Sequence, residues 1–204
     1  MIYVLFSAWM IASVVFQVLF NWISRKINYG YGKKMEYVAI GLNMLVWGIF
    51  YAKWVSPTIK EGFQPMQLLF IIVCTVLISI IFIDLKYYEI PNSYNAFIAL
   101  AGIFYITQTG DSWLNFLLGG IIAFVLFFLI AIFTGGNLGM GDVKLVLGLG
   151  FLLGKALLFP FFIVTFLSGA LISIALLVFK LKTSKDRIAF GPYICFGFIW
   201  LLLA

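Results

Sequence analysis

The chain has 204 residues, of which 65% are hydrophobic, 19% aromatic and 10% charged, with no histidine and a formal net charge of +6. A soluble domain carries about 25% charged residues to cover its surface. This composition therefore excludes a soluble globular domain and predicts an integral membrane protein. The lack of histidine also excludes Ser-His-Asp and Cys-His nucleophiles and histidine-ligated metals, so any chemistry must use other side chains.

Eight apolar runs follow one another along the chain. A helix needs about 20 residues to cross a hydrocarbon core of about 30 Å. The runs lack the alternation of a β-barrel, and backbone polar groups must be paired within a bilayer, so each run is predicted to be a helix. We expect an all-α polytopic membrane protein with about eight transmembrane helices, forming a single membrane-embedded domain over residues 1–204. The predicted spans are 1–23, 35–55, 66–83, 93–108, 113–134, 143–158, 160–179 and 189–204.

Basic residues concentrate in two connections, one after the first run and one before the last. The positive-inside rule places both connections in the cytoplasm, and eight spans then put the N-terminus and the C-terminus outside. No basic stretch is long enough to follow a phosphate backbone, so nucleic acid is not an expected partner. The residues concerned are Arg25, Lys26, Lys33 and Lys34 in the first connection, and Lys180, Lys182, Lys185 and Arg187 in the second.

Asp84 ends the third apolar run, at the predicted cytosolic boundary of the membrane. A carboxylate at the end of a membrane helix is commonly only an interfacial charge, so Asp84 alone does not define a site. The polar segment that follows it, 84–92, connects the third run to the fourth on the same predicted side.

Asp142 follows a glycine-rich segment that precedes the sixth run, on the same predicted side as Asp84. Its glycines indicate positive φ angles or a close approach to another backbone, although a flexible loop is the alternative interpretation. A phosphate-binding Walker A loop is excluded because Asp142 and Val143 stand where Lys and Ser or Thr are required. A magnesium site with paired aspartates is conceivable, but the further acids expected around the ion are missing. The glycines are Gly135, Gly136, Gly139 and Gly141.

Two aspartates at the cytosolic ends of different helices can meet in a helix bundle. Two carboxyl groups close together do not both ionise easily, so one of them retains a proton. The ionised group can then act as a base on a bound water while the protonated one hydrogen-bonds a scissile carbonyl. This chemistry hydrolyses a peptide bond without histidine or metal.

The two aspartate segments together carry a resemblance that extends over nearly the whole chain. The segments are Ile83-Asp84-Leu85-Lys86 with Ile90-Pro91-Asn92, and Gly139-Met140-Gly141-Asp142-Val143-Lys144. In this pattern the chain resembles the type IV prepilin leader peptidase family of GxGD-type membrane aspartyl proteases. The segment Phe190-Gly191-Pro192-Tyr193 is similar to the last span of that family.

The resemblance implies an aspartic endopeptidase of the bacterial cytoplasmic membrane, in which Asp84 and Asp142 are the catalytic pair. Its partners would be membrane lipid and a prepilin or pseudopilin precursor, from which it removes a short basic leader at the cytosolic face. Gly139 and Gly141 would let the loop approach Asp84 and the substrate backbone. Neither a metal nor a cofactor is implied. The resemblance also implies that Lys86, Lys144 and Pro91 bind the substrate and shape the site.

The connection after the first span departs from the family pattern. Bifunctional members carry two CxxC pairs there that bind zinc, and they also N-methylate the new amino terminus. Residues 24–34 of this chain contain no cysteine. A four-thiolate zinc site is impossible with two cysteines, so we predict peptidase activity without methyltransferase activity.

The two cysteines and the glycines of the later spans are interpreted as packing residues. Cys74 and Cys195 lie inside apolar runs, which predicts small buried hydrophobic side chains. Gly150 and Gly154 have the GxxxG spacing of closely packed membrane helices.

Two other functions are alternatives to a peptidase. A small proton-coupled transporter would place an acid near the middle of a span, whereas Asp84 and Asp142 both lie at predicted span boundaries. A purely structural subunit of a secretion machine is the third possibility.

Overall fold

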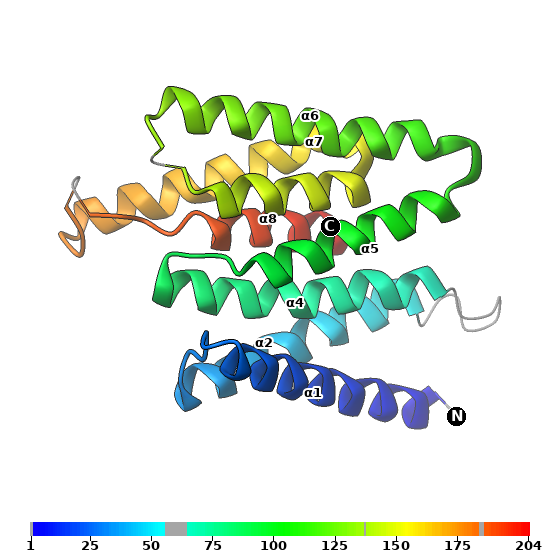
Figure 1. Ribbon diagram of the computed structural model, residues 1–204. Helices are drawn as coiled ribbons and strands as arrows, with labels where there is room; N and C mark the ends of the chain where they lie inside the picture. Colours follow the sequence, from blue (N-terminus) through cyan, green and yellow to red (C-terminus); the bar gives the residue numbers. More distant parts are fainter. Residues whose placement is uncertain (1, 56–64, 137, 184–185) are drawn as a thin grey trace. The chain divides into compact units, whose positions relative to one another are not determined.

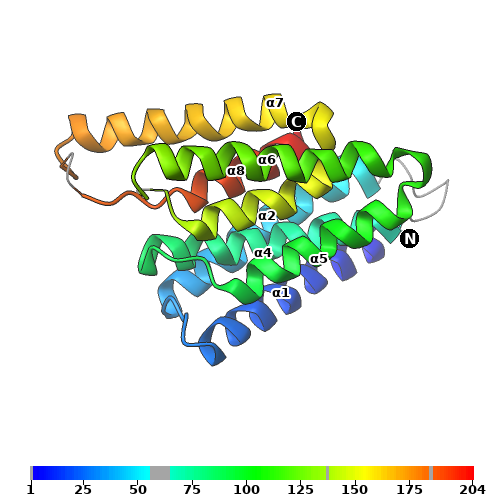
Figure 2. The same cartoon turned by 45° about the horizontal axis from the view of Figure 1, so that its top comes forward.

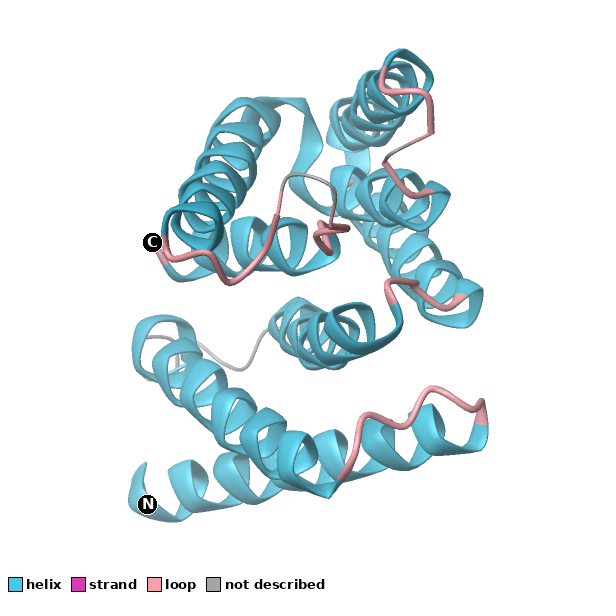
Figure 3. Ribbon diagram, turned by 90° about the vertical axis from the view of Figure 1, so that its left-hand side faces the viewer, coloured by secondary structure: helices cyan, strands magenta, loops and turns pink. Residues whose placement is uncertain are grey.

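The computed structural model of the protein describes residues 2–55, 65–136, 138–183 and 186–204. Its regular elements are helices, and no strand is present among the residues described (Figure 3). The predicted all-α class is therefore confirmed. Most of the predicted outer connection 56–65 lies outside the described residues, as do Asn137 and Lys185.

The chain forms two compact units, one over Met1–Tyr87 and the other over Tyr88–Leu202. Asp84 belongs to the first unit and Asp142 to the second. That the two units act as a single domain stays a prediction. The first unit contains α1 (Ile2–Lys26), α2 (Lys33–Phe50), the π-helical turn Tyr51–Val55 and α4 (Pro65–Tyr87) (Figure 1). The second unit contains α5 (Asn92–Gln108), the 3-10 turn Gly110–Ser112, α6 (Trp113–Phe133), α7 (Met140–Val178) and α8 (Gly191–Leu203).

Five of the described helices are long and apolar enough to cross a membrane: α1, α2 with its π-helical turn, α4, α6 and α7. Large apolar side chains stay exposed on these helices, including Ile11 with 65% and Leu171 with 59% of its surface accessible. A soluble protein does not expose so many such side chains, and lipid is their natural environment. The protein is therefore a multi-pass membrane protein, while the number of eight spans stays a prediction.

Buried polar side chains join the three helices of the first unit. Asn43 of α2 donates a hydrogen bond to the Ser13 carbonyl of α1 at 2.8 Å. The hydroxyl oxygen of Thr75 on α4 lies 3.1 Å from the side-chain oxygen Oδ1 of Asn43, and it accepts a hydrogen bond from the Trp47 indole at 3.0 Å. Apolar contact alone does not favour helix association in lipid, so such hydrogen bonds, each about 1–2 kcal/mol at most, help to fix the helix arrangement.

The long helix α7 consists of two segments that meet at Gly154, where φ is 67° and ψ is 168°. Figures 1 and 2 show that α7 turns back on itself within its yellow part, and Gly154 is the residue inside the helix with non-helical backbone angles. The spans 143–158 and 160–179 predicted a break at the turn near Pro160; this position is wrong, because Pro160 lies inside the second segment. The break requires a positive φ, which glycine adopts freely and the proline ring forbids. A Cβ at Gly154 would also lie 2.5 Å from Nδ2 of Asn115.

Glycines let the first segment of α7 pack closely against both α5 and α6. A Cβ at Gly148 would lie 2.9 Å from the backbone nitrogen of Ala99 on α5. A Cβ at Gly150 would lie 2.7 Å from the carbonyl oxygen of Gly119 on α6. Backbones that approach this closely need small residues at the contact. The first segment of α7, which carries Asp142 in its first turn, is thus held on two sides within the second unit.

Candidate active site

Asp84 lies in the last turn of α4, three residues before the helix ends at Tyr87. Only 4% of its surface is accessible, and Ile83 beside it is fully buried. The helix ends here because Tyr88 adopts a positive φ of 56° and because Pro91 disfavours helical geometry at the residue before it. Asp84 therefore lies near a helix end, as its place at the end of an apolar run indicated, and its carboxyl group is buried.

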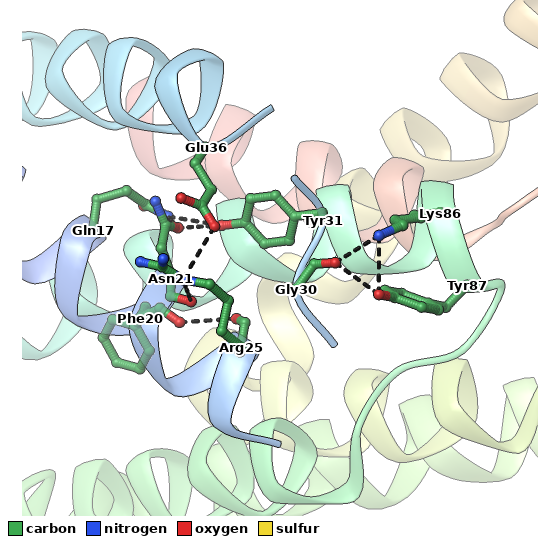
Figure 4. A network of polar contacts seen from close by, with 10 residues as sticks. Gln17, Phe20, Asn21, Arg25, Gly30, Tyr31, Glu36, Lys86 and Tyr87 are labelled. Carbon is green, nitrogen blue, oxygen red and sulfur yellow. Dashed lines mark hydrogen bonds and ion pairs between the residues drawn. The ribbon is translucent and has the colours of Figure 1, made fainter. Parts of the chain in front are cut away.

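The end of α4 is fastened to the connection between α1 and α2. The Lys86 ammonium and the Tyr87 hydroxyl both donate to the carbonyl oxygen of Gly30, at 2.6 Å and 2.7 Å (Figure 4). Tyr29 packs edge-on against the Tyr87 ring. Within the first unit, the α1–α2 connection is therefore bonded to the end of α4, two and three residues after Asp84.

Tyr31 anchors the same connection more deeply. Its ring stacks on Phe82 at a centroid distance of 5.5 Å, and only 3% of its surface is accessible. Its hydroxyl donates a short hydrogen bond to Asn21 and lies 3.5 Å from the Gln17 amide nitrogen (Figure 4). Gln17 also donates to Ser79 of α4 at 3.0 Å. This buried polar network ties α1, the connection and α4 together one turn before Asp84.

Asp142 is the third residue of α7, whose N-cap is Gly139. A carboxylate in the first turn of a helix is stabilised by the helix dipole. The side chain is largely buried, with 8% of its surface accessible. A Cβ at Gly139 would lie 3.3 Å from Oδ2 of Asp142, so the glycine leaves room for the carboxylate.

The beginning of α5 contacts the beginning of α7. A Cβ at Gly141 would lie 3.2 Å from Cβ of Ile90, the residue before the α5 N-cap Pro91. The Lys144 ammonium donates to the side-chain oxygen Oδ1 of Asn92 at 2.9 Å. The structure thus brings Pro91, Gly141 and Lys144 into one region of the second unit.

The glycines before Asp142 have the geometry that the sequence indicated. Gly135 and Gly136 adopt positive φ angles of 64° and 83°. They end α6 through backbone hydrogen bonds from Gly136 to Ala131 at 2.9 Å and from Gly135 to Ile132 at 3.0 Å, the pattern of a Schellman motif. The first two glycines therefore end a helix, whereas Gly141 makes the close approach, to Ile90.

The assigned residues fall into two groups. Gly139, Gly141, Asp142, Lys144 and Pro91 lie in the second unit, whereas Asp84 and Lys86 lie in the first. That the two groups form one active site stays a prediction. Tyr31 packs near Asp84, and the Asn95 side chain donates to the Gly141 carbonyl oxygen at 3.2 Å, but neither residue belongs to a motif, so the sequence alone did not indicate them.

Residues 71–174 match the model of the type IV leader peptidase family, and this region contains both Asp84 and Asp142. The chain is 32% identical over 131 residues to a Bacillus subtilis (strain 168) protein named prepilin leader peptidase/N-methyltransferase, an alignment covering 63% of this chain and 52% of that protein. A protein of the same name from Aeromonas hydrophila is 27% identical over 155 residues, covering 72% of this chain and 53% of its own length.

The chain thus spans about half the length of the curated relatives that it matches. No solved structure matches it. Because the family model covers half of the chain, the chain belongs to the type IV leader peptidase family.

Proposed function

We propose that the chain is a membrane aspartic endopeptidase that removes the basic leader of type IV prepilin or pseudopilin precursors. In this proposal it resides in the bacterial cytoplasmic membrane, with both termini outside and the aspartate segments at the cytosolic face. Its membership of the leader peptidase family and the names of its relatives support the substrate class.

The observation that carries the proposal is the contact between Ile90 and Gly141 in the second unit. Ile90 follows Asp84 by six residues, so covalent geometry keeps their Cα atoms within about 20 Å. Gly141 immediately precedes Asp142. The segment that leaves Asp84 therefore leads to the turn that presents Asp142, which supports a shared site.

In the proposed reaction, one carboxylate takes a proton from a bound water as the water oxygen attacks the scissile carbonyl carbon. The other, protonated carboxyl donates a hydrogen bond and then its proton to the carbonyl oxygen. The carboxyl that took the proton from the water gives it to the amine nitrogen as the C–N bond breaks, and the other carboxylate takes a proton from a diol hydroxyl as the carbonyl of the product re-forms. Asp84 and Asp142 exchange protonated and ionised roles over the cycle.

The remaining assigned residues are proposed to shape the site. Gly139 leaves space beside the Asp142 carboxylate, and Gly141 admits the backbone next to Pro91. Lys86 and Lys144 fix the segments that flank the two aspartates, through Gly30 and Asn92.

We further propose that the chain lacks methyltransferase activity, although its relatives are named for both activities. The connection between α1 and α2 contains no cysteine, and Cys74 and Cys195, the cysteines of this chain, are buried. A four-thiolate zinc site is therefore not available to this connection.

Cleavage of a prepilin-like precursor by the purified chain in detergent, with S-adenosylmethionine present, tests both proposals. Mass spectrometry should detect a product shortened by the leader and carrying a free amine. An intact precursor would contradict peptidase activity. A product heavier by one methyl group would contradict only the loss of methyltransferase activity.

A further inference from the structure

Asn95 lies in the first turns of α5 and contacts the turn that presents Asp142. Its side-chain nitrogen donates to the carbonyl oxygen of Gly141 at 3.2 Å. This carbonyl belongs to the peptide group that joins Gly141 to Asp142. Rotation of that peptide group would move the Asp142 side chain, so the hydrogen bond from Asn95 acts on the position of the carboxylate.

The same two helix starts share a second, outer hydrogen bond. Asn92 and Asn95 are three residues apart on α5, and Gly141 and Lys144 are three residues apart on α7, so each pair lies on one helix face. Lys144 bonds to Asn92 at the exposed edge, whereas Asn95 is 97% buried, with 3% of its surface accessible. The outer bond is exposed and the inner one is partly buried, so water competes less with the inner bond, which therefore holds the turn more strongly.

The orientation of the Asn95 amide follows from its contact with the Gly141 carbonyl oxygen, because this acceptor requires the NH₂ group to face it. With the amide reversed, its oxygen would face the Gly141 oxygen, and the two acceptors would repel each other. In the orientation observed, Oδ1 of Asn95 is buried and has no hydrogen-bond partner among the described residues. An unpaired buried acceptor destabilises a fold, so an apolar side chain would suit this position better if only packing mattered.

We propose that Asn95 is a positioning residue for Asp142: its amide holds the Gly141 carbonyl and thereby fixes the direction in which the carboxylate points. The proposal rests on the peptidase function proposed above for Asp142. Gly139, Gly141 and Asn95 then have complementary effects, because the glycines give the turn its space and the amide restricts its rotation.

Asn95→Leu removes the donor and keeps a side chain of comparable size. Misplacement of a catalytic group by about 1 Å reduces turnover by up to a hundredfold, so we expect kcat for precursor cleavage to fall by about 10- to 100-fold. KM should stay within about twofold, since Asn95 does not need to touch the substrate. Asn95→Gln retains an amide donor on a longer arm and should recover part of the lost kcat.

Asn43→Leu is the matched control, because Asn43 is also buried and its amide donates to the Ser13 carbonyl at 2.8 Å, in the first unit. It removes this bond and also the bond between Thr75 and the Asn43 side-chain oxygen, so it sets an upper limit on the general effect of losing one such bond, and it should leave kcat within about twofold of wild type. If Asn95→Leu cannot be purified in folded form, Asn95→Ala removes the same donor without adding bulk.

Amide hydrogen exchange of the full chain in detergent gives a readout that does not depend on activity. Asn95→Leu should speed exchange over residues 140–146 and leave residues 155–178 unchanged, and Asn43→Leu should change neither. Faster exchange in this first turn supports the positioning role of Asn95. If the wild-type chain cleaves no precursor, that failure contradicts only the proposed peptidase function and leaves the exchange result valid. Unchanged exchange and unchanged kcat in Asn95→Leu, or equal losses of kcat in Asn95→Leu and Asn43→Leu, would overturn it.

Discussion

The Lys86 ammonium lies 2.6 Å from the carbonyl oxygen of Gly30, so the α1–α2 connection is fixed to α4 two residues after Asp84. Tyr87 donates to the same oxygen from the neighbouring position. A residue assigned to the site by its motif therefore makes a contact that stabilises the segment around Asp84. This contact gives Lys86 a role that can be tested separately from catalysis.

Lys86→Met should loosen the α1–α2 connection while leaving α4 folded. A hydrogen bond contributes about 1 kcal/mol, so its loss should raise the open population about fivefold. Limited digestion with trypsin measures this population, because Arg25, Lys26, Lys33 and Lys34 flank the connection. Lys155→Met, at an exposed position of α7, is the control and should not change the digestion rate. Equal digestion rates for Lys86→Met and wild type would show that the contact does not hold the connection.

Tyr31→Phe should lower the stability of the protein without changing its fold. The substitution removes the hydroxyl that bonds to the side-chain oxygen of Asn21, which keeps its bond from Gln17, and the loss of one such hydrogen bond costs about 1 kcal/mol. The midpoint of thermal unfolding in detergent should fall accordingly. The control is Tyr37→Phe, because Tyr37 is 72% exposed and its midpoint should match that of wild type. A Tyr31→Phe protein as stable as wild type would contradict the network described here.

Gly154→Ala should disrupt the reversal of α7. Alanine disfavours the φ of 67° observed there, and its Cβ would lie 2.5 Å from Nδ2 of Asn115. We expect a loss of at least about 2 kcal/mol in the free energy of unfolding, measured by chemical denaturation in mixed micelles. Gly41→Ala is the matched control, since no atom lies within 4 Å of the Cβ position in the helix α2. It should be neutral or stabilising by up to about 1 kcal/mol, and the account of the bend fails if the two variants behave alike.

The helical class and the placement of both aspartates at helix ends followed from hydropathy and motifs. Asp84 ends one apolar run and Asp142 directly precedes another, and an acid at the boundary of an apolar run is visible in the sequence alone. The bend in α7 was misplaced because Pro160 is a strong local signal, whereas the positive φ of Gly154 depends on how α7 packs against α6. GxxxG spacing indicated close packing at Gly154 but not a reversal.

The contacts that fix the motifs could not be predicted from their own residues. Asn95 belongs to no motif, and its bond to Gly141 exists only because α5 and α7 pack together at their starts. Likewise, Gly30 accepts bonds from Lys86 and Tyr87 across 56 and 57 residues of sequence. Local patterns indicate which residues have unusual chemistry, and tertiary packing decides which side chains hold them in place.

The pairing of Asp84 with Asp142 is tested most directly by precursor cleavage with Asp84→Asn and Asp142→Asn made separately. Asparagine keeps the size of the side chain but cannot ionise, so each variant should lose at least about a thousandfold in kcat while still being inserted into the membrane. Asp186→Asn, which changes an exposed carboxylate that accepts bonds from Thr183, should cleave at the wild-type rate. Cleavage near the wild-type rate by either of the first two variants would contradict a catalytic aspartate pair.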